Sequence, residues 1–389
     1  MRIVIVVGAA DDDMLGLSKA MRGAFEPQST GTAYLAPVDC IRGFDTKFFT
    51  HAPPTAANEE LDAALHTLIV AMLDRDVPDA TLTWLDAAAA LVQSSQGRHK
   101  LIAFVADESA QRAIAPRAPR LARVQSNLIG RFGERALRPA ALGLIVISES
   151  RRLLADATPD TREKRSKLFI SHAKADGLPL ALAIRSHLAT IPHLQSFYDD
   201  TNLMLSSDWV ADLESNVATS TVLILWTDAF ETRPDCRKEA LWASRYGCPT
   251  LVIDVRNGLV QRGSSLGLGS LPAVRLPDGN LIRAIHLALW AGLRGAVLAR
   301  QVTELDRSGV LNGTSIRTLQ RAPSLEALAS IGDELRASEA SGSEVLVFHP
   351  DPPLDEVSRQ AMESAAASHG PIVRLVTIDE ILRLHEGIR

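Results

Sequence analysis

The chain has 389 residues, of which 46% are apolar, and this is enough for two or three buried cores because single domains usually hold about 100–200 residues. The 46 acidic residues outnumber the 41 basic ones, and the net charge of −5 argues against binding to nucleic acid or to an anionic membrane surface. Cys40, Cys236 and Cys248 match neither a disulfide framework nor a metal site, so the sequence predicts a reducing, cytoplasmic location.

Residues 1–155 are predicted to form an α/β domain with a sensory or regulatory role. Apolar runs predict strands at RIVIVVG (2–8), KLIAFVA (100–106) and LGLIVIS (142–148). The stretch ANEELDAALHTLIVAML (57–73) is typical of a helix. The first run is too short to span a membrane and indicates a buried strand. The polar segment 156–165 is predicted to be a linker.

Residues 166–303 have the clearest βα rhythm. Apolar runs begin near Leu168, Gln195, Thr221 and Pro249, a spacing of about 27 residues that suits a strand, a helix and a short connection. The run TVLILW (221–226) is apolar throughout, as a strand covered on both faces must be. A doubly wound parallel sheet is therefore expected. The apolar stretch 284–300 is interrupted by His286 and Arg294, which favours a packing helix over a membrane span.

Residues 304–389 are predicted to form a second, smaller α/β domain. Its expected strands are SEVLVFHP (343–350) and PIVRLVTID (371–379), with a helix at DEVSRQAMESAAAS (355–368) between them.

Polar residues follow each strand predicted in the middle block, and ligands of open parallel sheets bind at this carboxyl edge. These residues are Ser171-His172, Asp199-Asp200, Thr227-Asp228 and Asp254. Polar residues are common where a strand leaves the core, so each of these residues also has an explanation that needs no function. Together they mark the edge at which a site is expected.

A helix is predicted from residue 233 to 246, with Thr232 as its N-cap, Pro234 in its first turn and Gly247 at its end. Its small residues, such as Cys236, form one packing face. Glu239 lies beside this face, and its helical neighbours at three and four positions are Asp235, Cys236, Trp242 and Ala243. None is a cation. A helical glutamate is usually a solvated surface residue, but the missing partner and the position near the sheet edge favour a functional role.

Three stretches of this block resemble, in order and spacing, the three conserved boxes of bacterial TIR (Toll/interleukin-1 receptor) domains. They are LFISHAKADG (168–177), FYDDTNLMLSSDW (197–209) and TDAFETRPDCRKEALWA (227–243). The resemblance implies a flavodoxin-like parallel sheet, here flanked by the two outer α/β domains. It also implies an enzyme that cleaves NAD+ at the nicotinamide–ribose bond and works as a self-assembled array, and it suggests a role as a bacterial defence effector.

The resemblance places the catalytic carboxylate of the family on Glu239. The substrate pocket would be formed by the loop after the first strand, by the loop from Asp199 to Asp208, and by residues of the third box. The residues expected to bind substrate are Ser171, His172, Asp176, Asp199, Asp200, Trp209, Thr227, Asp235 and Trp242. No metal or cofactor is implied, since NAD+ is the substrate. Enzymatic members usually carry Trp in place of Asp235, and Pro-Gly in place of Leu205-Ser206.

One carboxylate can suffice for this reaction. Glycosidases need two carboxylates because the leaving oxygen must be protonated, whereas the nicotinamide of NAD+ is already cationic and leaves as a neutral molecule. A single anion can then stabilise the oxocarbenium charge that develops on the ribose. Two alternatives stay open: a TIR module that only recruits other proteins, and a nucleotide-sensing receptor without cleavage. The sequence GSSLG (263–267) matches a nucleophile elbow but lacks the strand before it.

Overall fold

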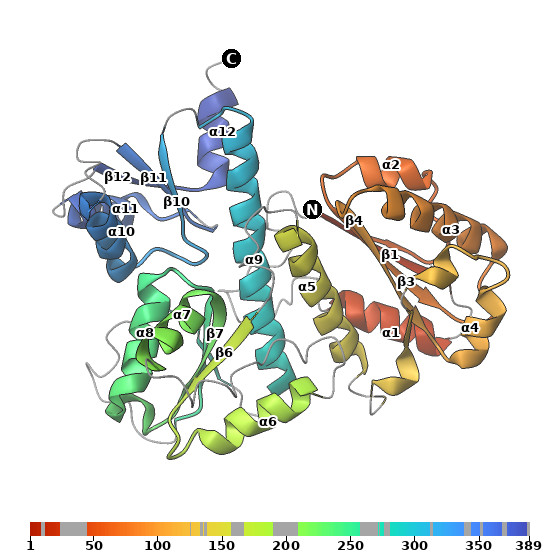
Figure 1. Cartoon of the computed structure of the whole chain (residues 1–389), viewed down its shortest axis with the longest axis horizontal. Helices are drawn as coiled ribbons and strands as arrows, with labels where there is room; N and C mark the ends of the chain where they lie inside the picture. Colours follow the sequence, from red (N-terminus) through yellow and green to blue (C-terminus); the bar gives the residue numbers. More distant parts are fainter. Residues whose placement is uncertain are drawn as a thin grey trace. The chain divides into compact units, whose positions relative to one another are not determined.

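The computed structural model divides the chain into two compact units, Met1–Lys164 with Thr190–Leu194, and Arg165–Ala189 with Gln195–Arg389. It describes the following residues: 1–8, 12–23, 45–124, 126–132, 135, 138–156, 167–189, 209–256, 271, 273–275, 281–311, 314–337, 344–350, 353–367 and 372–386. Three parallel sheets of five, four and three strands make this an α/β protein (Figure 1).

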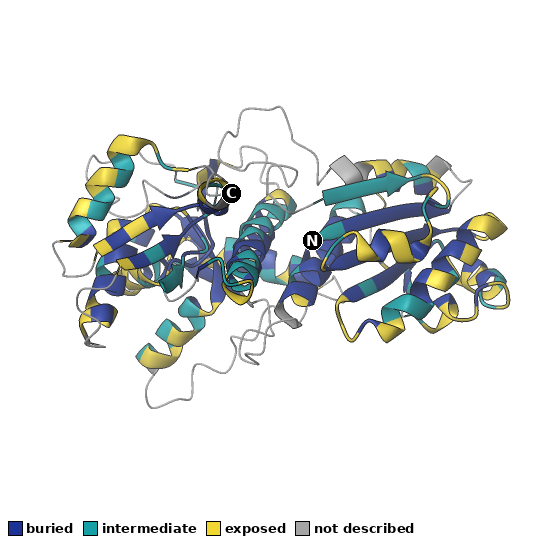
Figure 2. Ribbon diagram, turned by 90° about the horizontal axis from the view of Figure 1, so that it is seen from above, coloured by how far each residue is buried: buried dark blue, intermediate teal, exposed yellow. Residues whose placement is uncertain are grey.

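The first unit is built on a five-stranded parallel sheet in the order β2-β1-β3-β4-β5, the doubly wound order in which ligands bind beside the first strand. Its elements are β1 (Arg2–Gly8), α1 (Asp12–Gly23), β2 (Asp45–Phe49), α2 (Ala57–Asp62), β3 (Thr67–Leu73), α3 (Asp79–Ser94), β4 (His99–Val105), α4 (Glu108–Ile114), η2 (Leu121–Arg123), β5 (Ser126–Leu128), η3 (Ile129–Arg131) and α5 (Arg138–Asp156). In Figure 2 the inner strands are dark blue because their side chains are buried.

Two predicted elements of this unit are wrong. The run LGLIVIS lies inside helix α5, and the stretch predicted as one helix from residue 57 to 73 ends its helix at Asp62 and continues as strand β3. Every residue of β3 is buried, and residues 141–150 of α5 are all buried too. Such segments carry no alternation of apolar and polar residues, so their pattern does not distinguish a strand from a helix. The strands predicted at residues 2–8 and 100–106 are confirmed.

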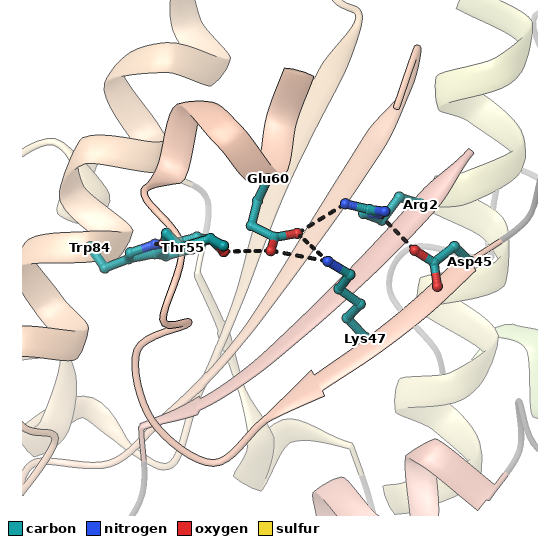
Figure 3. Close-up of polar contacts among 6 residues, drawn as sticks. All are labelled: Arg2, Asp45, Lys47, Thr55, Glu60 and Trp84. Carbon is teal, nitrogen blue, oxygen red and sulfur yellow. Dashed lines mark hydrogen bonds and ion pairs between the residues drawn. The ribbon is translucent and has the colours of Figure 1, made fainter. Parts of the chain in front are cut away.

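A buried carboxylate ties β1, β2 and α2 together (Figure 3). Glu60 of α2 is 2% exposed and accepts hydrogen bonds from Arg2 at 3.1 Å, from Lys47 at 3.1 Å and from Thr55 at 2.5 Å. Arg2 also donates to Asp45 at 2.8 Å. We call Arg2, Lys47, Thr55 and Glu60 the Glu60 cluster. Burial alone would raise the pKa of Glu60, but the hydrogen bonds from Thr55 and Lys47 and the nearby positive charges outweigh burial and lower this pKa.

The second unit contains a four-stranded parallel sheet in the order β6-β7-β8-β9 and a three-stranded parallel sheet in the order β10-β11-β12. Its elements are β6 (Lys167–His172), α6 (Leu178–Ala189), α7 (Trp209–Ala218), β7 (Ser220–Trp226), η8 (Phe230–Thr232), α8 (Pro234–Arg245), β8 (Thr250–Asp254), β9 (Ala273–Arg275), α9 (Leu281–Arg307), β10 (Ser315–Thr318), α10 (Leu325–Ala337), β11 (Glu344–Phe348), α11 (Glu356–Ala367), β12 (Ile372–Val376) and α12 (Ile378–Glu386). The strands predicted near residues 168, 221, 249, 343 and 371 are confirmed. The strand predicted near Gln195 lies outside the described residues.

Helix α9 links the two sheets of this unit and runs past both of them in Figure 1. It contacts β7 and β8, and its Leu298 and Val302 pack with Phe348 and Val376 of the smaller sheet. Among the described helices, α9 has the length and apolar content that a membrane crossing would need, and half of its most apolar window is buried. Core helices pass the same test, so the contacts of α9 with both sheets are enough to explain its composition.

Candidate active site

The candidate site lies where β6, β7 and β8 end, at the carboxyl edge of the four-stranded sheet. β6 ends at Ser171-His172, β7 is followed by Thr227, and β8 ends at Asp254, as the sequence predicts. β6 and β7 are hydrogen-bonded neighbours, with Ser171 opposite Ile224. The side chains at the ends of these strands therefore meet at one edge of the sheet.

Glu239 is joined to the end of β6 by a short hydrogen bond. The hydroxyl of Ser171, which is 1% exposed, donates to Oε2 of Glu239 at 2.5 Å. Glu239 itself is half-buried on α8. The bond joins a residue of the stretch 168–177 to a residue of the stretch 227–243, 68 positions apart in the chain.

The small face of α8 makes this contact possible. Cys236 and Ala243 of α8 are buried in the core of the four-stranded sheet, together with Phe169 of β6. The thiol of Cys236 donates to the backbone oxygen of His172 at 3.4 Å, so α8 is held against the end of β6 one turn before Glu239. The helix begins at Pro234, one residue after the predicted start, and its N-cap residue is Arg233, with no side chain that caps it. Thr232, the predicted cap, belongs to η8 and donates to Ala229 instead.

Asp176 and Thr227 form a second contact between the loops of this edge. Thr227 is 6% exposed and donates through Oγ1 to Asp176 at 2.6 Å, and the backbone N–H of Ala229 donates to the other carboxylate oxygen at 2.8 Å. Asp176 therefore fixes the start of the loop after β7 to the loop after β6. This is a structural role in addition to the substrate contact expected from the sequence.

The other predicted site residues have different surroundings. Asp235 is exposed and pairs with Lys238 at 3.5 Å. Trp242 is half-buried and packs against the core of the sheet. The Nδ1 atom of His172 lies 3.3 Å from the oxygen of Ile170, and its buried Nε2 has no hydrogen-bond partner within the described part of the chain. Asp199, Asp200, the Leu205-Ser206 pair and the side chain of Trp209 lie outside the described residues.

Sequence reasoning missed a charged cluster at the ends of β7 and β8. Arg256 binds both carboxylate oxygens of Asp254, at 2.8 and 2.9 Å, and its guanidinium lies 3.2 Å from the centre of the Trp226 ring. Hydrogen bonds from Arg256 and Arg275 lower the pKa of Asp254 to about 2. Trp226 therefore has Arg256 against its ring, and its Nε1 donates to Glu231.

The cysteines of this unit are expected to be unreactive in the native protein. Burial and the negative charges of Glu239 and Asp235 raise the pKa of Cys236 to about 12, and burial raises the pKa of Cys248 to about 12. Because the thiolate is the reactive form, iodoacetamide at pH 8 should leave both residues unmodified until denaturant is added. Mass spectrometry of the peptides that contain Cys236 and Cys248 checks this expectation. Alkylation of native Cys236 at pH 8 would contradict the packing of α8 described above.

In the part of the chain that the structure describes, no group of three His, Cys, Asp or Glu side chains could hold a metal ion. Comparison of the sequence with protein-family models and with curated proteins finds no match. The assignment of the site therefore depends on the contacts of Glu239, Ser171, Asp176 and Thr227, together with the sequence boxes that contain them.

Proposed function

We propose that residues 166–303 form a TIR domain that hydrolyses NAD+ at the nicotinamide–ribose bond, with Glu239 as the catalytic residue. The observation that carries the proposal is the hydrogen bond between Ser171 and Glu239. It joins the first and third boxes at the carboxyl edge of a parallel sheet, where ligands of this architecture bind. The second box, from residue 197 to 209, supplies the rest of the pocket in this proposal.

In the proposed reaction, the carboxylate of Glu239 has a single role. As the bond to nicotinamide breaks, its electron pair goes to the ring nitrogen and the ring leaves neutral, so no proton has to be supplied. Positive charge develops on the ribose, and the carboxylate of Glu239 stabilises it and accepts hydrogen bonds from ribose hydroxyls. Ser171 holds the carboxylate in one orientation before substrate arrives, which reduces the reorganisation needed in the transition state. Water then attacks the ribose cation, one proton is released to the solvent, and ADP-ribose is formed.

The proposal includes self-association through the TIR domain and a role as a bacterial immune effector in the cytoplasm. In such an assembly, the loop from Asp199 to Asp208 of one subunit would help to complete the site of its neighbour. Residues 1–155 would sense a signal or regulate the TIR domain. Neither nucleic acid nor a membrane is a proposed partner.

A second candidate function is a TIR module that recruits other proteins without cleaving NAD+. Asp235 favours this candidate. It occupies the position at which enzymatic family members usually carry Trp, and it is an exposed acid paired with Lys238. An aromatic platform for the nicotinamide or adenine ring is therefore missing at this position.

Incubation of the purified full-length protein with NAD+ decides between the two. The protein should be assayed over a range of concentrations high enough for assembly, with the products separated by chromatography. Release of nicotinamide and ADP-ribose that rises more steeply than in proportion to protein concentration is the expected result. Intact NAD+ at concentrations where light scattering detects assemblies would exclude catalysis by the chain alone and favour the recruitment module.

A further inference from the structure

Helix α10, which packs on the smaller sheet of the second unit, also contacts α8, the helix that carries Glu239. Ser244 of α8 is 2% exposed, and its hydroxyl lies 3.0 Å from that of Ser324 and donates to Glu326 at 3.3 Å. One position later, Arg245 donates to Ser330 at 3.2 Å. Ser324 precedes α10, and Glu326 and Ser330 belong to α10, so the C-terminal half of α8 is bound to the start of α10.

Residues 319–324, which connect β10 to α10 and are called the strap below, fit against two glycines. The backbone N–H of Gln320 donates to the oxygen of Gly247 at 3.0 Å. A Cβ at Gly247 would lie 2.6 Å from the side chain of Leu319, and a Cβ at Gly295 of α9 would lie 2.6 Å from Cβ of Gln320. Carbon atoms cannot approach so closely, and the strap therefore occupies space that only glycine leaves open at these two positions.

The strap also contains a buried charged residue, Arg321. Arg321 is 8% exposed, and burial lowers its pKa to about 10, partly offset by the proximity of Cys248 and Glu326. Its Nη1 has no hydrogen-bond partner among the described residues. A guanidinium is costly to bury, and that of Arg321 donates through Nε to the backbone oxygen of Ala322 at 3.4 Å.

We propose that the strap is a positioning element for Glu239. Through the strap, the part of the chain that contains the smaller sheet holds the catalytic carboxylate in its place. This inference rests on the proposed function. Glu239 lies between two attachments of α8: Cys236, which is bound to the end of β6, and Ser244, which is bound to Ser324 and Glu326. With the second attachment released, the helix can pivot about the first, and the carboxylate moves away from Ser171. A displacement of about 1 Å at a catalytic group costs on the order of 100-fold in rate.

A size-compensating pair tests the proposal. Gly295→Ala puts a methyl group against Gln320 while it improves the helix propensity of α9, and Gln320→Gly removes the atoms that it would strike. Hydrogen exchange of residues 234–246 and the kcat and KM for nicotinamide release should be measured on the full-length protein. Gly295→Ala should speed exchange in α8 about tenfold or more and lower kcat on the order of 10- to 100-fold with little change in KM. Adding Gln320→Gly should return both quantities close to the wild-type values.

Gly16→Ala is the matched control, because this helical glycine of the first unit has nothing within 4 Å of a new Cβ. Equal α8 exchange in Gly295→Ala and in this control, or no recovery in the double variant, would overturn the proposal. If the wild type releases no nicotinamide, the proposed function fails, and the exchange measurement still decides whether the strap holds α8. Should Gly295→Ala not fold, Ser324→Ala removes the hydroxyl beside Ser244 and permits the same comparison with a smaller expected effect.

Discussion

Replacement of Glu239 by alanine is expected to lower the kcat for nicotinamide release on the order of 1,000-fold, the upper end of the loss that follows removal of one preorganised charge-stabilising group in other enzymes. The carboxylate is the only group that the proposed mechanism uses to stabilise the ribose cation. Glu239→Gln keeps the shape and the hydrogen bond from Ser171 but removes the charge, and it should be almost as inactive. The measurement is nicotinamide release by chromatography, with folding checked by circular dichroism and assembly by light scattering.

Glu214→Gln is a suitable control for the Glu239 variants. Glu214 lies on α7, accepts a hydrogen bond from Tyr246 at 2.7 Å, and has no part in the proposed chemistry. It should retain wild-type kcat. Wild-type activity in both Glu239 variants would mean that another group performs the cleavage. If the wild type cleaves NAD+, and the Glu239 variants assemble normally but do not cleave it, the protein is an enzyme and not only a recruitment module.

The position of Glu239 could be predicted from sequence because it depends on local spacing. The apolar run of β7, Pro234 near the start of the helix and Gly247 after its end together define α8, and all three features are present in the structure. The small residues of α8 indicated close packing on the sheet, which the burial of Cys236 and Ala243 confirms. The local sequence pattern was enough to predict where α8 lies in the chain and which of its faces is buried.

The contacts that complete the edge could not be predicted, because they depend on how distant segments pack. Arg256 lies against the ring of Trp226, which is 30 positions earlier in the chain, and the docking of Ser324 on Ser244 joins residues 80 positions apart. No periodicity in the sequence encodes these pairs. Because β3 was not predicted as a strand, the residue that follows it, Asp74, could not be placed either. β3 is the neighbour of β1 in the sheet, so Asp74 follows the sheet at the same edge as the end of β1.

Replacement of Glu60 by alanine is expected to destabilise the first unit by roughly 3 kcal/mol, the lower end of the range for removing one partner of a buried ion pair. The low end applies because Lys47 keeps 34% of its side-chain exposure, whereas Arg2 keeps 15% and Glu60 only 2%. Without the carboxylate, Arg2 retains Asp45 as a partner, but the described contacts leave Lys47 and the Thr55 hydroxyl without their acceptor. Hydrogen exchange of the β1 and β3 amides in the full-length chain should become about 100-fold faster, since each 1.4 kcal/mol is a factor of ten.

The pH dependence of the folding stability provides a second test of the role of Glu60. The pKa of Glu60 is lower in the folded chain than its ordinary value of 4.5, so the folded state binds the proton less readily than the unfolded state. The stabilisation is therefore fully present above the ordinary value, and it is lost as the pH falls through the lower, folded-state pKa. The stability difference between the wild type and Glu60→Gln should be constant between pH 6 and 7 and shrink progressively below about pH 4.5.

Glu59→Ala is the matched control, because Glu59 is the neighbouring acid on α2 and its side chain is exposed. Exposed charges of this kind contribute little to stability, so exchange in β1 and β3 should stay within about threefold of the wild type. Equal exchange in the Glu59 and Glu60 variants, or a stability difference that grows as the pH falls, would show that the carboxylate does not hold β1, β2 and α2 together. The Glu60 cluster would then have no energetic role in the fold of the first unit.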